Sequence, residues 1–258
     1  MMAALRVATL NIRTSAAPDG RNAWWLRRRS TLAAIRNLDA DLIGLQEVHA
    51  TQLAWLTPHL SDTYEVVSRG RAREDHGERT MVLARRSAVT VRGVEARWYS
   101  DTPDQPASRH WGNRLPRFAL FTQVEAADRT FTFVATHLDH ASAESRAASA
   151  SALTSWLAND GIAHAAIVVG DTNCAADDPI LRPLLDLPMT DALAHLPGRG
   201  PQSATFHAWR GSSDGTRMDQ VLVGAGWRVE SSLIDRARPR GRLPSDHWPV
   251  VASIEPTS

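Results

Sequence analysis

The stretch AAIVVGDTNCAADDP, Ala165–Pro179, decides the fold because a short apolar run in it ends directly in polar residues. Apolar residues rich in Val and Ile and closed by Gly170 predict a strand that is buried on both faces. Asp171 and Asn173 then stand at the carboxyl end of this strand. A turn alone would also explain them, because Asp and Asn hydrogen-bond their own backbone. The rest of the sequence has to show whether Asp171 and Asn173 only form a turn or belong to a functional site.

The order strand, helix, strand occurs twice along the chain. Each helix is predicted from apolar residues that recur at helical spacing, and each strand from a short apolar run. The first unit consists of Arg6–Ile12, Ala23–Leu38 and Asp41–Val48, and the second of Phe131–His140, Ala141–Ala158 and His164–Asn173. Two such units predict an α/β fold with two sheets that are each covered by helices.

The remaining β-rich runs are short and have polar breaks, which is typical of antiparallel strands. These runs are Tyr64–Gly70, Thr80–Ser87, Val89–Tyr99, Arg117–Ala126, Arg217–Val223, Trp227–Asp235 and His247–Glu255. Two segments rich in Pro, Gly and Ser, Thr102–Pro116 and Leu196–Gly215, are predicted to be loops. Neither loop separates self-sufficient halves, so we expect residues 1–258 to form a single domain.

The composition restricts the class of protein and its chemistry. The chain has 258 residues, and 43% of them are hydrophobic. Its formal net charge of +1 provides no overall electrostatic attraction to nucleic acid or to an anionic membrane. All 29 basic residues are Arg, which excludes lysine-based mechanisms, and the single cysteine, Cys174, excludes a thiolate zinc cluster. No window resembles a signal peptide or a membrane span, so we expect a soluble, cytoplasmic protein without a membrane partner.

Two short segments are rich in arginine. Arg27–Arg29 lie on the first predicted helix, where a solvated outer face is the ordinary explanation. Arg236–Arg242, with the sequence RARPRGR, lead into Ser245–His247 and therefore border a candidate site. They could recruit an extended anionic substrate, although a solvated loop is the simpler interpretation.

Metal-competent or phosphate-competent side chains stand at the ends of the predicted strands. They are Asn11, Glu47, His137, Asp171, Asn173, Asp219, Asp246 and His247. Each alone has a structural explanation, such as a cap, a turn or a core histidine. Together they favour one ligand crevice, because in open α/β sheets the ligand binds outside the carboxyl ends of the strands. The residues that precede the C-terminal strands reach the same edge if those strands run antiparallel to the others.

The residue types in this set indicate a reaction class. Carboxylate and amide oxygens without thiolates favour a hard cation such as Mg²⁺ or Mn²⁺. An Asp and a His close to that cation supply a base that activates water. The combination predicts hydrolysis at phosphorus.

Six motifs in this order resemble one known family. TLNIR, GLQEV, THLDH, GDTN, RMDQVLV and SDHWPV are similar to motifs of the endonuclease/exonuclease/phosphatase superfamily, which has the deoxyribonuclease I-like fold. The resemblance covers nearly the whole chain. It implies a four-layer α/β sandwich, in which two facing mixed β-sheets are flanked by helices.

The resemblance also implies a role for each motif residue. Glu47 would be the principal Mg²⁺ or Mn²⁺ ligand, supported by Asn11. Asp171 would orient or deprotonate the attacking water, while Asn173 and His137 would contact the phosphate.

The two C-terminal motifs complete this set. Asp246 would lie close to the metal, and His247 would act at the phosphate as a base or as an electrostatic stabiliser. Asp219 would orient the ring of His247. Whether Asp171 or His247 takes the proton of the water is left open by the resemblance.

The loops offer further candidates for substrate binding. These are Arg109, Trp111, Arg117 and His207. Surface packing of a long loop explains His207 equally well, and Arg117 opens a strand and could be structural.

Three functions follow as hypotheses. The first is a Mg²⁺- or Mn²⁺-dependent phosphoesterase that hydrolyses a phosphomonoester or phosphodiester of a small phosphorylated molecule. The second is a nuclease acting on DNA or RNA, against which the near-zero net charge counts. The third is a non-catalytic binding protein on the same fold, which would have no need of a water-activating set. No protein partner is implied.

Overall fold

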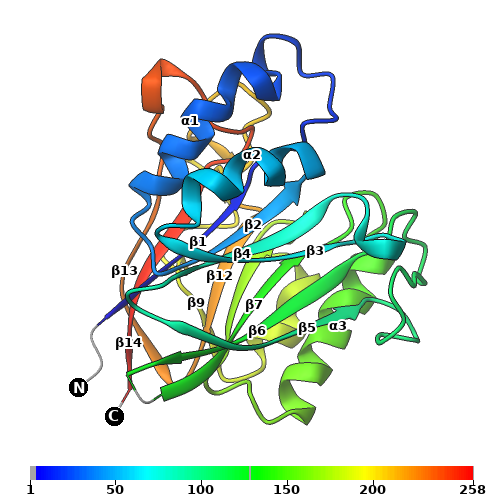
Figure 1. The fold of residues 1–258 in the computed structure, drawn as a ribbon. Coiled ribbons are helices and arrows are strands. Elements are labelled where there is room, and N and C mark those ends of the chain that lie inside the picture. The colour runs from blue at the N-terminus through cyan, green and yellow to red at the C-terminus, as the bar shows by residue number, and fades with distance from the viewer. Residues whose placement is uncertain (1–3, 128, 258) are drawn as a thin grey trace.

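Two facing β-sheets form the centre of the structure, a computed structural model that describes residues 4–127 and 129–257. Figure 1 shows helices α1 (Trp24–Asn37) and α2 (Ala50–Leu60) on the outer side of one sheet and helix α3 (Ala143–Asn159) on the outer side of the other. The order of layers is therefore helix, sheet, sheet, helix. This arrangement confirms the predicted four-layer α/β sandwich.

The first sheet has six strands in the order β13-β14-β1-β2-β4-β3. Their bounds are Trp227–Ile234, Val250–Pro256, Leu5–Asn11, Leu42–Val48, Arg79–Arg85 and Tyr64–Gly70. Strands β1 and β2 are parallel, and all other neighbours in this sheet are antiparallel. The parallel pair is the first predicted strand–helix–strand unit, with α1 as its crossover.

The second sheet has six strands in the order β5-β6-β7-β8-β12-β9. Their bounds are Thr90–Trp98, Phe118–Ala126, Arg129–His137, Ile167–Asp171, Asp219–Gly224 and Met189–Asp191. Strands β7 and β8 are parallel and are connected by α3, which is the second predicted unit. A short hairpin of β10 (Arg199–Gly200) and β11 (Gly215–Thr216) lies within and beside the second predicted loop.

The other helices of the structure are short. They are α4 (Arg182–Leu185) and the 3₁₀ turns η1 (Gly20–Asn22), η2 (Arg73–Asp75), η3 (Pro179–Leu181) and η4 (Pro239–Gly241). The sequence analysis predicted no helix at α2. This helix begins with a capping box formed by His49 and Gln52, and it contains Pro58 near its end. A histidine cap and an internal proline are weak helix signals, which explains the omission.

Strand direction brings the predicted site residues to one edge of the two sheets. Strands β1, β2, β7 and β8 end there with their carboxyl ends. Strand β12 runs antiparallel to β8, with Asp219 opposite Asp171. Strand β14 runs antiparallel to β1, so that Asp246 and His247, which precede it, also reach this edge.

The two sheets approach each other closely at Gly44 of β2. A Cβ atom there would lie 2.5 Å from Cγ2 of Val169 and 3.3 Å from Cβ of Ala135, which are both on the opposite sheet. The surrounding core is made of apolar side chains from both sheets, including Leu42 and Val221. The absence of a side chain at position 44 therefore permits the contact between β2 and β8.

We expect Gly44→Ala to lower the free energy of unfolding by about 1–3 kcal/mol, because the added methyl group overpacks the interface between the sheets. Urea denaturation measures this change. Gly93→Ala is the matched control, since the nearest atom there is Oε1 of the flexible Gln123 side chain, at 3.1 Å. Equal stability of Gly44→Ala and the unchanged protein would contradict the close approach.

Among the described residues, no helix combines the length and the apolar character needed to cross a membrane.

Candidate active site

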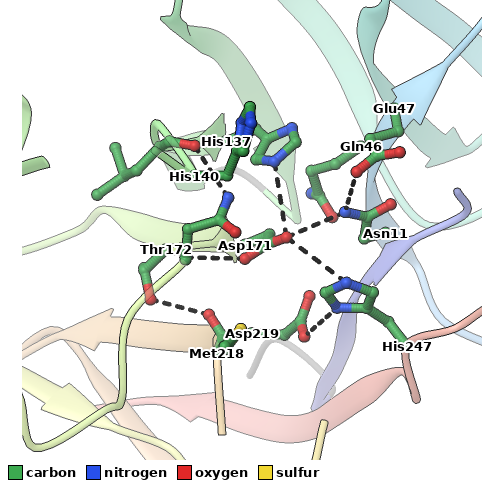
Figure 2. A network of polar contacts seen from close by, with 12 residues as sticks. Asn11, Gln46, Glu47, His137, His140, Asp171, Thr172, Met218, Asp219 and His247 are labelled. Carbon is green, nitrogen blue, oxygen red and sulfur yellow. Dashed lines mark hydrogen bonds and ion pairs between the residues drawn. The ribbon is translucent and has the colours of Figure 1, made fainter. Parts of the chain in front are cut away.

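The polar residues at the shared sheet edge line a cleft of about 290 Å³ (Figure 2). Its walls include Glu47, His137, Asp171, Asn173, Asp246, His247 and Arg117. Asn11 and Asp219 are fully buried and contact the lining residues from below. The structure therefore brings together all eight residues that the strand ends and motifs singled out.

Glu47 reaches the cleft through an irregularity in β2. The pairing of β2 with β4 shifts register between Leu45 and Val48, and Glu47 has a φ of 59°, in the left-handed region. A bulge of this kind redirects a side chain that would otherwise follow the alternation of the strand. Strained backbone at a carboxylate is typical of functional sites.

Hydrogen bonds fix the Glu47 carboxylate. Its Oε1 accepts from Nδ2 of Asn11 at 3.0 Å, and its Oε2 accepts from the backbone N–H of Thr14 at 3.0 Å. Burial would raise the pKa of Glu47, but these hydrogen bonds and the positive charges of His247 and Arg13 outweigh it and lower the pKa. Glu47 is therefore an anion at neutral pH.

Three side chains converge on one oxygen of Asp171. Its Oδ2 accepts from Nδ2 of Asn11 at 3.0 Å and lies 3.6 Å from Nε2 of His137 and 3.8 Å from Nε2 of His247. Figure 2 shows this oxygen between the two imidazole rings and the amide. The other oxygen accepts from the backbone N–H of Asn173 at 2.8 Å. Burial, followed by the charge of Asp219, raises the pKa of Asp171 to about 7.

His247 and Asp219 form a buried pair. Nδ1 of His247 lies 2.8 Å from Oδ2 of Asp219, and its Nε2 faces Asp171. Burial would lower the pKa of His247, but the carboxylates of Asp219 and Asp171 raise it to about 10. The imidazole is therefore a cation at neutral pH, and it presents an N–H to the cleft.

His137 has the opposite charge state. NH1 of Arg117 donates to its Nδ1 at 2.9 Å, and because a guanidinium can only donate, the ring carries its hydrogen on Nε2. Burial and the charge of Arg117 lower the pKa of His137 well below its ordinary value. His137 is therefore neutral and directs an N–H toward Asp171.

Arg117 is a buried organiser of the cleft wall. Its NH2 donates to Nδ1 of His140 at 3.1 Å, and its Nε lies 3.8 Å from Oδ2 of Asp139. Burial lowers the pKa of this guanidinium below its ordinary value. Arg117 fixes two histidines and so has the structural role that the sequence allowed; it also lines the cleft, and its contact with a substrate stays a prediction.

A second pair of carboxylates faces the cleft at Glu47 and Asp246. The guanidinium of Arg13 lies 4.0 Å from Oε2 of Glu47 and 3.7 Å from Oδ2 of Asp246. Burial raises the pKa of Asp246, and the negative charge of Glu47 adds to this rise. Two like charges gathered at one point favour a cation between or beside them.

A further group of possible metal ligands lies deeper in the site. Asp171, Asp219 and His247 offer atoms that all lie within 4.8 Å of one another. In this group, however, the His247 nitrogen next to Asp219 is already hydrogen-bonded to that carboxylate. The oxygen-only pair at Glu47 and Asp246 is chemically the better match for a hard cation.

Asn173 is held in place by its backbone conformation and by one side-chain hydrogen bond. Its backbone adopts a φ of 51°, and its Nδ2 donates to the carbonyl of Leu138 at 3.0 Å. The amide is thereby fixed at the cleft wall beside Asp171.

Three residues that were predicted to contact the substrate do not line the cleft: Arg109, Trp111 and His207. Arg109 donates to the carbonyl of Arg114, and Trp111 donates from Nε1 to Asp101 and packs against the core below α3. The part of the loop that carries Arg109 and Trp111 thus folds onto itself, whereas Leu115 near the end of the loop lines the cleft.

His207 is buried against Trp248, with ring centroids 4.3 Å apart, and its backbone N–H donates to the carbonyl of Asp246. It positions the segment that carries the site residues. Its neighbour Phe206 lines the cleft instead and packs against His247, with ring centroids 4.9 Å apart.

Sequence reasoning missed several residues of the cleft. They are Arg13, Thr14, Arg71, Glu78, Leu115, His140, Phe206 and Met218. A signal existed for Arg13, His140 and Met218, because all three stand inside quoted motifs. Arg71 and Glu78 belong to the connection between β3 and β4, and nothing in the sequence indicates that this connection reaches the site.

Comparisons with known proteins agree with this geometry. A model of the endonuclease/exonuclease/phosphatase family matches residues 8–247. No curated protein gave a sequence match.

Three solved structures are similar to this chain. An endonuclease/exonuclease/phosphatase from Bacteroides vulgatus is 26% identical to this chain with a TM-score of 0.89, and the match covers 99% of this chain and 100% of the other. A conserved protein of unknown function from Enterococcus faecalis V583 is 26% identical with a TM-score of 0.88 and coverage of 98% and 100%. A mannosyl-6-phosphatase from Bacteroides thetaiotaomicron is 24% identical with a TM-score of 0.87 and coverage of 97% and 99%.

The family match at residues 8–247 includes every residue that lines the cleft and each of the motif residues from Asn11 to His247. The chain therefore belongs to the endonuclease/exonuclease/phosphatase family.

Proposed function

We propose that this protein is a Mg²⁺- or Mn²⁺-dependent phosphoesterase that hydrolyses a phosphate ester of a small molecule. The observation that carries the proposal is the position of the Asp171 carboxylate, which faces an amide, a neutral imidazole and a cationic imidazole within 3.8 Å. The anionic pair Glu47 and Asp246 lies on the same cleft. Such a set suits the activation of water beside a phosphate.

The donor set fits a divalent cation. Glu47 is held as an anion, Asp246 faces it, and Asn11 supports Glu47 through its amide. These oxygen donors suit Mg²⁺ or Mn²⁺ rather than a soft metal. When bound, the cation would supply Lewis-acid polarisation of a phosphoryl oxygen.

We assign the role of general base to Asp171. A base works best when its pKa lies near the operating pH, and the raised pKa of Asp171, about 7, meets this condition. His247 already carries a proton at neutral pH and therefore cannot accept one from water. Its charged N–H instead stabilises negative charge that develops on the phosphoryl oxygens. Asp219 holds the ring in this orientation.

His137 and Asn173 are proposed to bind the phosphate group. The neutral His137 directs an Nε2–H into the site because Arg117 occupies its other nitrogen. A neutral donor binds a phosphate oxygen without competing with Asp171 for a proton. The base Asp171 therefore lies between the cationic imidazole of His247 and the neutral imidazole of His137.

The size of the cleft supports a small substrate. A cavity of about 290 Å³ lies at the lower limit of the usual range for small-molecule sites. The mannosyl-6-phosphatase among the similar structures is named for a sugar phosphate, which is a small molecule. The near-zero net charge gives no support for a long polyanion in this cleft.

We expect Glu47→Gln to raise the Mg²⁺ or Mn²⁺ concentration needed for half-maximal hydrolysis at least about tenfold, because the amide removes a charge from the cation site. A metal titration of the rate with p-nitrophenyl phosphate measures this shift. Glu255→Gln is the matched control, since Glu255 lies at the far end of β14. An unchanged metal requirement in Glu47→Gln would exclude Glu47 as a ligand.

A further inference from the structure

Two arginine-rich segments that are distant in the sequence pack together beside the cleft. Residues 20–37 contain five arginines and residues 236–245 contain four, and neither segment contains Asp or Glu. Figure 1 shows the blue helix α1 next to the orange turn η4, which lies within the second segment. Nine of the 29 arginines therefore lie on two neighbouring segments of a protein whose overall charge is close to zero.

This corner contains a cavity of about 240 Å³ that is lined by guanidinium groups. Arg21, Arg27, Arg238 and Arg242 are on its wall together with Trp209, and no carboxylate lines it. Among the described residues, none of these four arginines forms an ion pair. The cavity thus combines a concave shape with four guanidinium groups that have no carboxylate in direct contact, which suits the binding of an anion.

Arg27 is the buried part of this wall, which corrects the interpretation of Arg27–Arg29 as a solvated face. Its side chain is 1% exposed, and its guanidinium donates to the carbonyls of Ile12, Arg13, Asn22 and Pro244. Neutral carbonyls satisfy its hydrogen bonds but leave its charge unopposed by a direct partner. A buried cation at the wall of a cavity attracts an anion more strongly than an exposed one, because water screens it less.

Trp209 supplies an unused hydrogen-bond donor. Its Nε1 is shielded from solvent and has no acceptor among the described residues, although buried donors are almost always paired. Its backbone has a φ of 64° and follows Ala208 at 47°, so two consecutive residues lie in the left-handed region. The ring lies 5.2 Å from the guanidinium of Arg27. The strained loop thus places the Trp209 ring in the pocket wall beside the four arginines.

We propose that this arginine pocket binds a phosphate group. Guanidinium groups match the paired oxygens of a phosphate, and the Trp209 ring forms part of the wall beside them. Arg21, Arg238 and Arg242 are exposed, so they are accessible to a ligand that enters from solvent. The pocket is distinct from the cleft, since the two cavities have no lining residue in common.

The pocket nevertheless borders the cleft on three chain segments. Arg27 donates to the carbonyl of Arg13, which lines the cleft. Phe206 of the cleft and Trp209 of the pocket are on one loop, and Arg242 lies just before Asp246. The bound phosphate is therefore either a second phosphate of the substrate or a free phosphate that acts beside the cleft.

Titration of the protein with inorganic phosphate tests the proposal directly. The indole N–H signal of Trp209 in ¹H–¹⁵N NMR spectra, assigned by its loss in Trp209→Phe, reports on the pocket because Trp209 lies in its wall, and the double variant below separates this response from binding in the cleft. We expect this signal to shift with phosphate in a saturable manner. In Arg21→Ala/Arg242→Ala the dissociation constant from this signal should rise at least about tenfold, since two charged donors are lost.

Arg182→Ala is the matched control, because Arg182 is exposed and lies on α4, next to α3 on the opposite outer layer. This variant should titrate like the unchanged protein. A Trp209 signal that does not respond to phosphate, or that responds equally in the double variant, would overturn the proposal. This measurement requires no activity, so its outcome is independent of the proposed function.

A kinetic comparison distinguishes the two sources of the phosphate and rests on the proposed function. If the pocket binds a second phosphate of the substrate, Arg21→Ala/Arg242→Ala should lower kcat/KM for glucose 1,6-bisphosphate at least about tenfold more than for glucose 6-phosphate. If the pocket binds free phosphate, the double variant should change both substrates alike.

Discussion

Replacing Asp171 by asparagine is expected to lower kcat for phosphate-ester hydrolysis by about 10³-fold. The amide keeps the size of the side chain but cannot accept a proton from water. The three neighbours that converge on Oδ2 of Asp171 would remain in place, so binding should change less than turnover. The loss should therefore be seen in kcat more than in KM.

Steady-state kinetics with p-nitrophenyl phosphate at saturating metal measure this effect. Asp186→Asn serves as the control, because the Asp186 side chain is 72% exposed and its ion pair with Arg182 is on the surface. Circular dichroism verifies that both variants are folded. A rate for Asp171→Asn within about tenfold of the unchanged protein would remove Asp171 from the role of base.

His247→Ala is expected to reduce kcat/KM by at least about 10²-fold. The substitution removes the cationic N–H that faces the cleft and leaves Asp219 buried without its partner. Oδ1 of Asp219 already has no hydrogen-bond partner among the described residues, so the loss of the ring leaves the whole carboxylate unpaired.

The pair can be separated from general destabilisation by a double-mutant cycle. If Asp219 acts through the ring of His247, Asp219→Asn should cost little additional rate in a His247→Ala background. His195→Ala, at an exposed histidine, should leave the rate unchanged. Additive losses from Asp219 and His247 would contradict their action as one unit.

Much of the fold could be predicted because the buried strands are short and uniformly apolar. The runs that lead to Asn11, Glu47, His137 and Asp171 each form a strand, and the bounds of these strands lie within a few residues of the predicted bounds. Helix α2 could not be predicted in this manner, because only three of its residues are buried and its cap is a histidine. Its stability comes from packing on the first sheet, which is a tertiary effect.

The candidate site was predictable as far as it depends on strand ends. Strand polarity brings Asp171, Asp219 and His247 together, and each of them ends or precedes a strand. Residues on long loops were not predictable in the same way. Trp111 and Arg109 had suitable side chains, but local hydrogen bonds turn them away from the cleft.

The arginine pocket shows a further limit of sequence reasoning. Arg27 and Arg242 each stand in a run that is ordinarily explained by solvation. Only the packing of η4 on α1 places them on one cavity. Contacts between segments more than 200 residues apart leave no local pattern in the sequence.

The central claim is that this cleft hydrolyses phosphate esters with the help of a divalent cation. Its most direct test is the hydrolysis of p-nitrophenyl phosphate, bis-p-nitrophenyl phosphate and single-stranded DNA in EDTA, Mg²⁺ or Mn²⁺, with Asp171→Asn in parallel. We predict turnover of a small phosphate ester that requires Mg²⁺ or Mn²⁺ and is lost in Asp171→Asn. Turnover that persists in EDTA, or that is unchanged in Asp171→Asn, would contradict the account, as would the absence of turnover with all three substrates at every metal concentration.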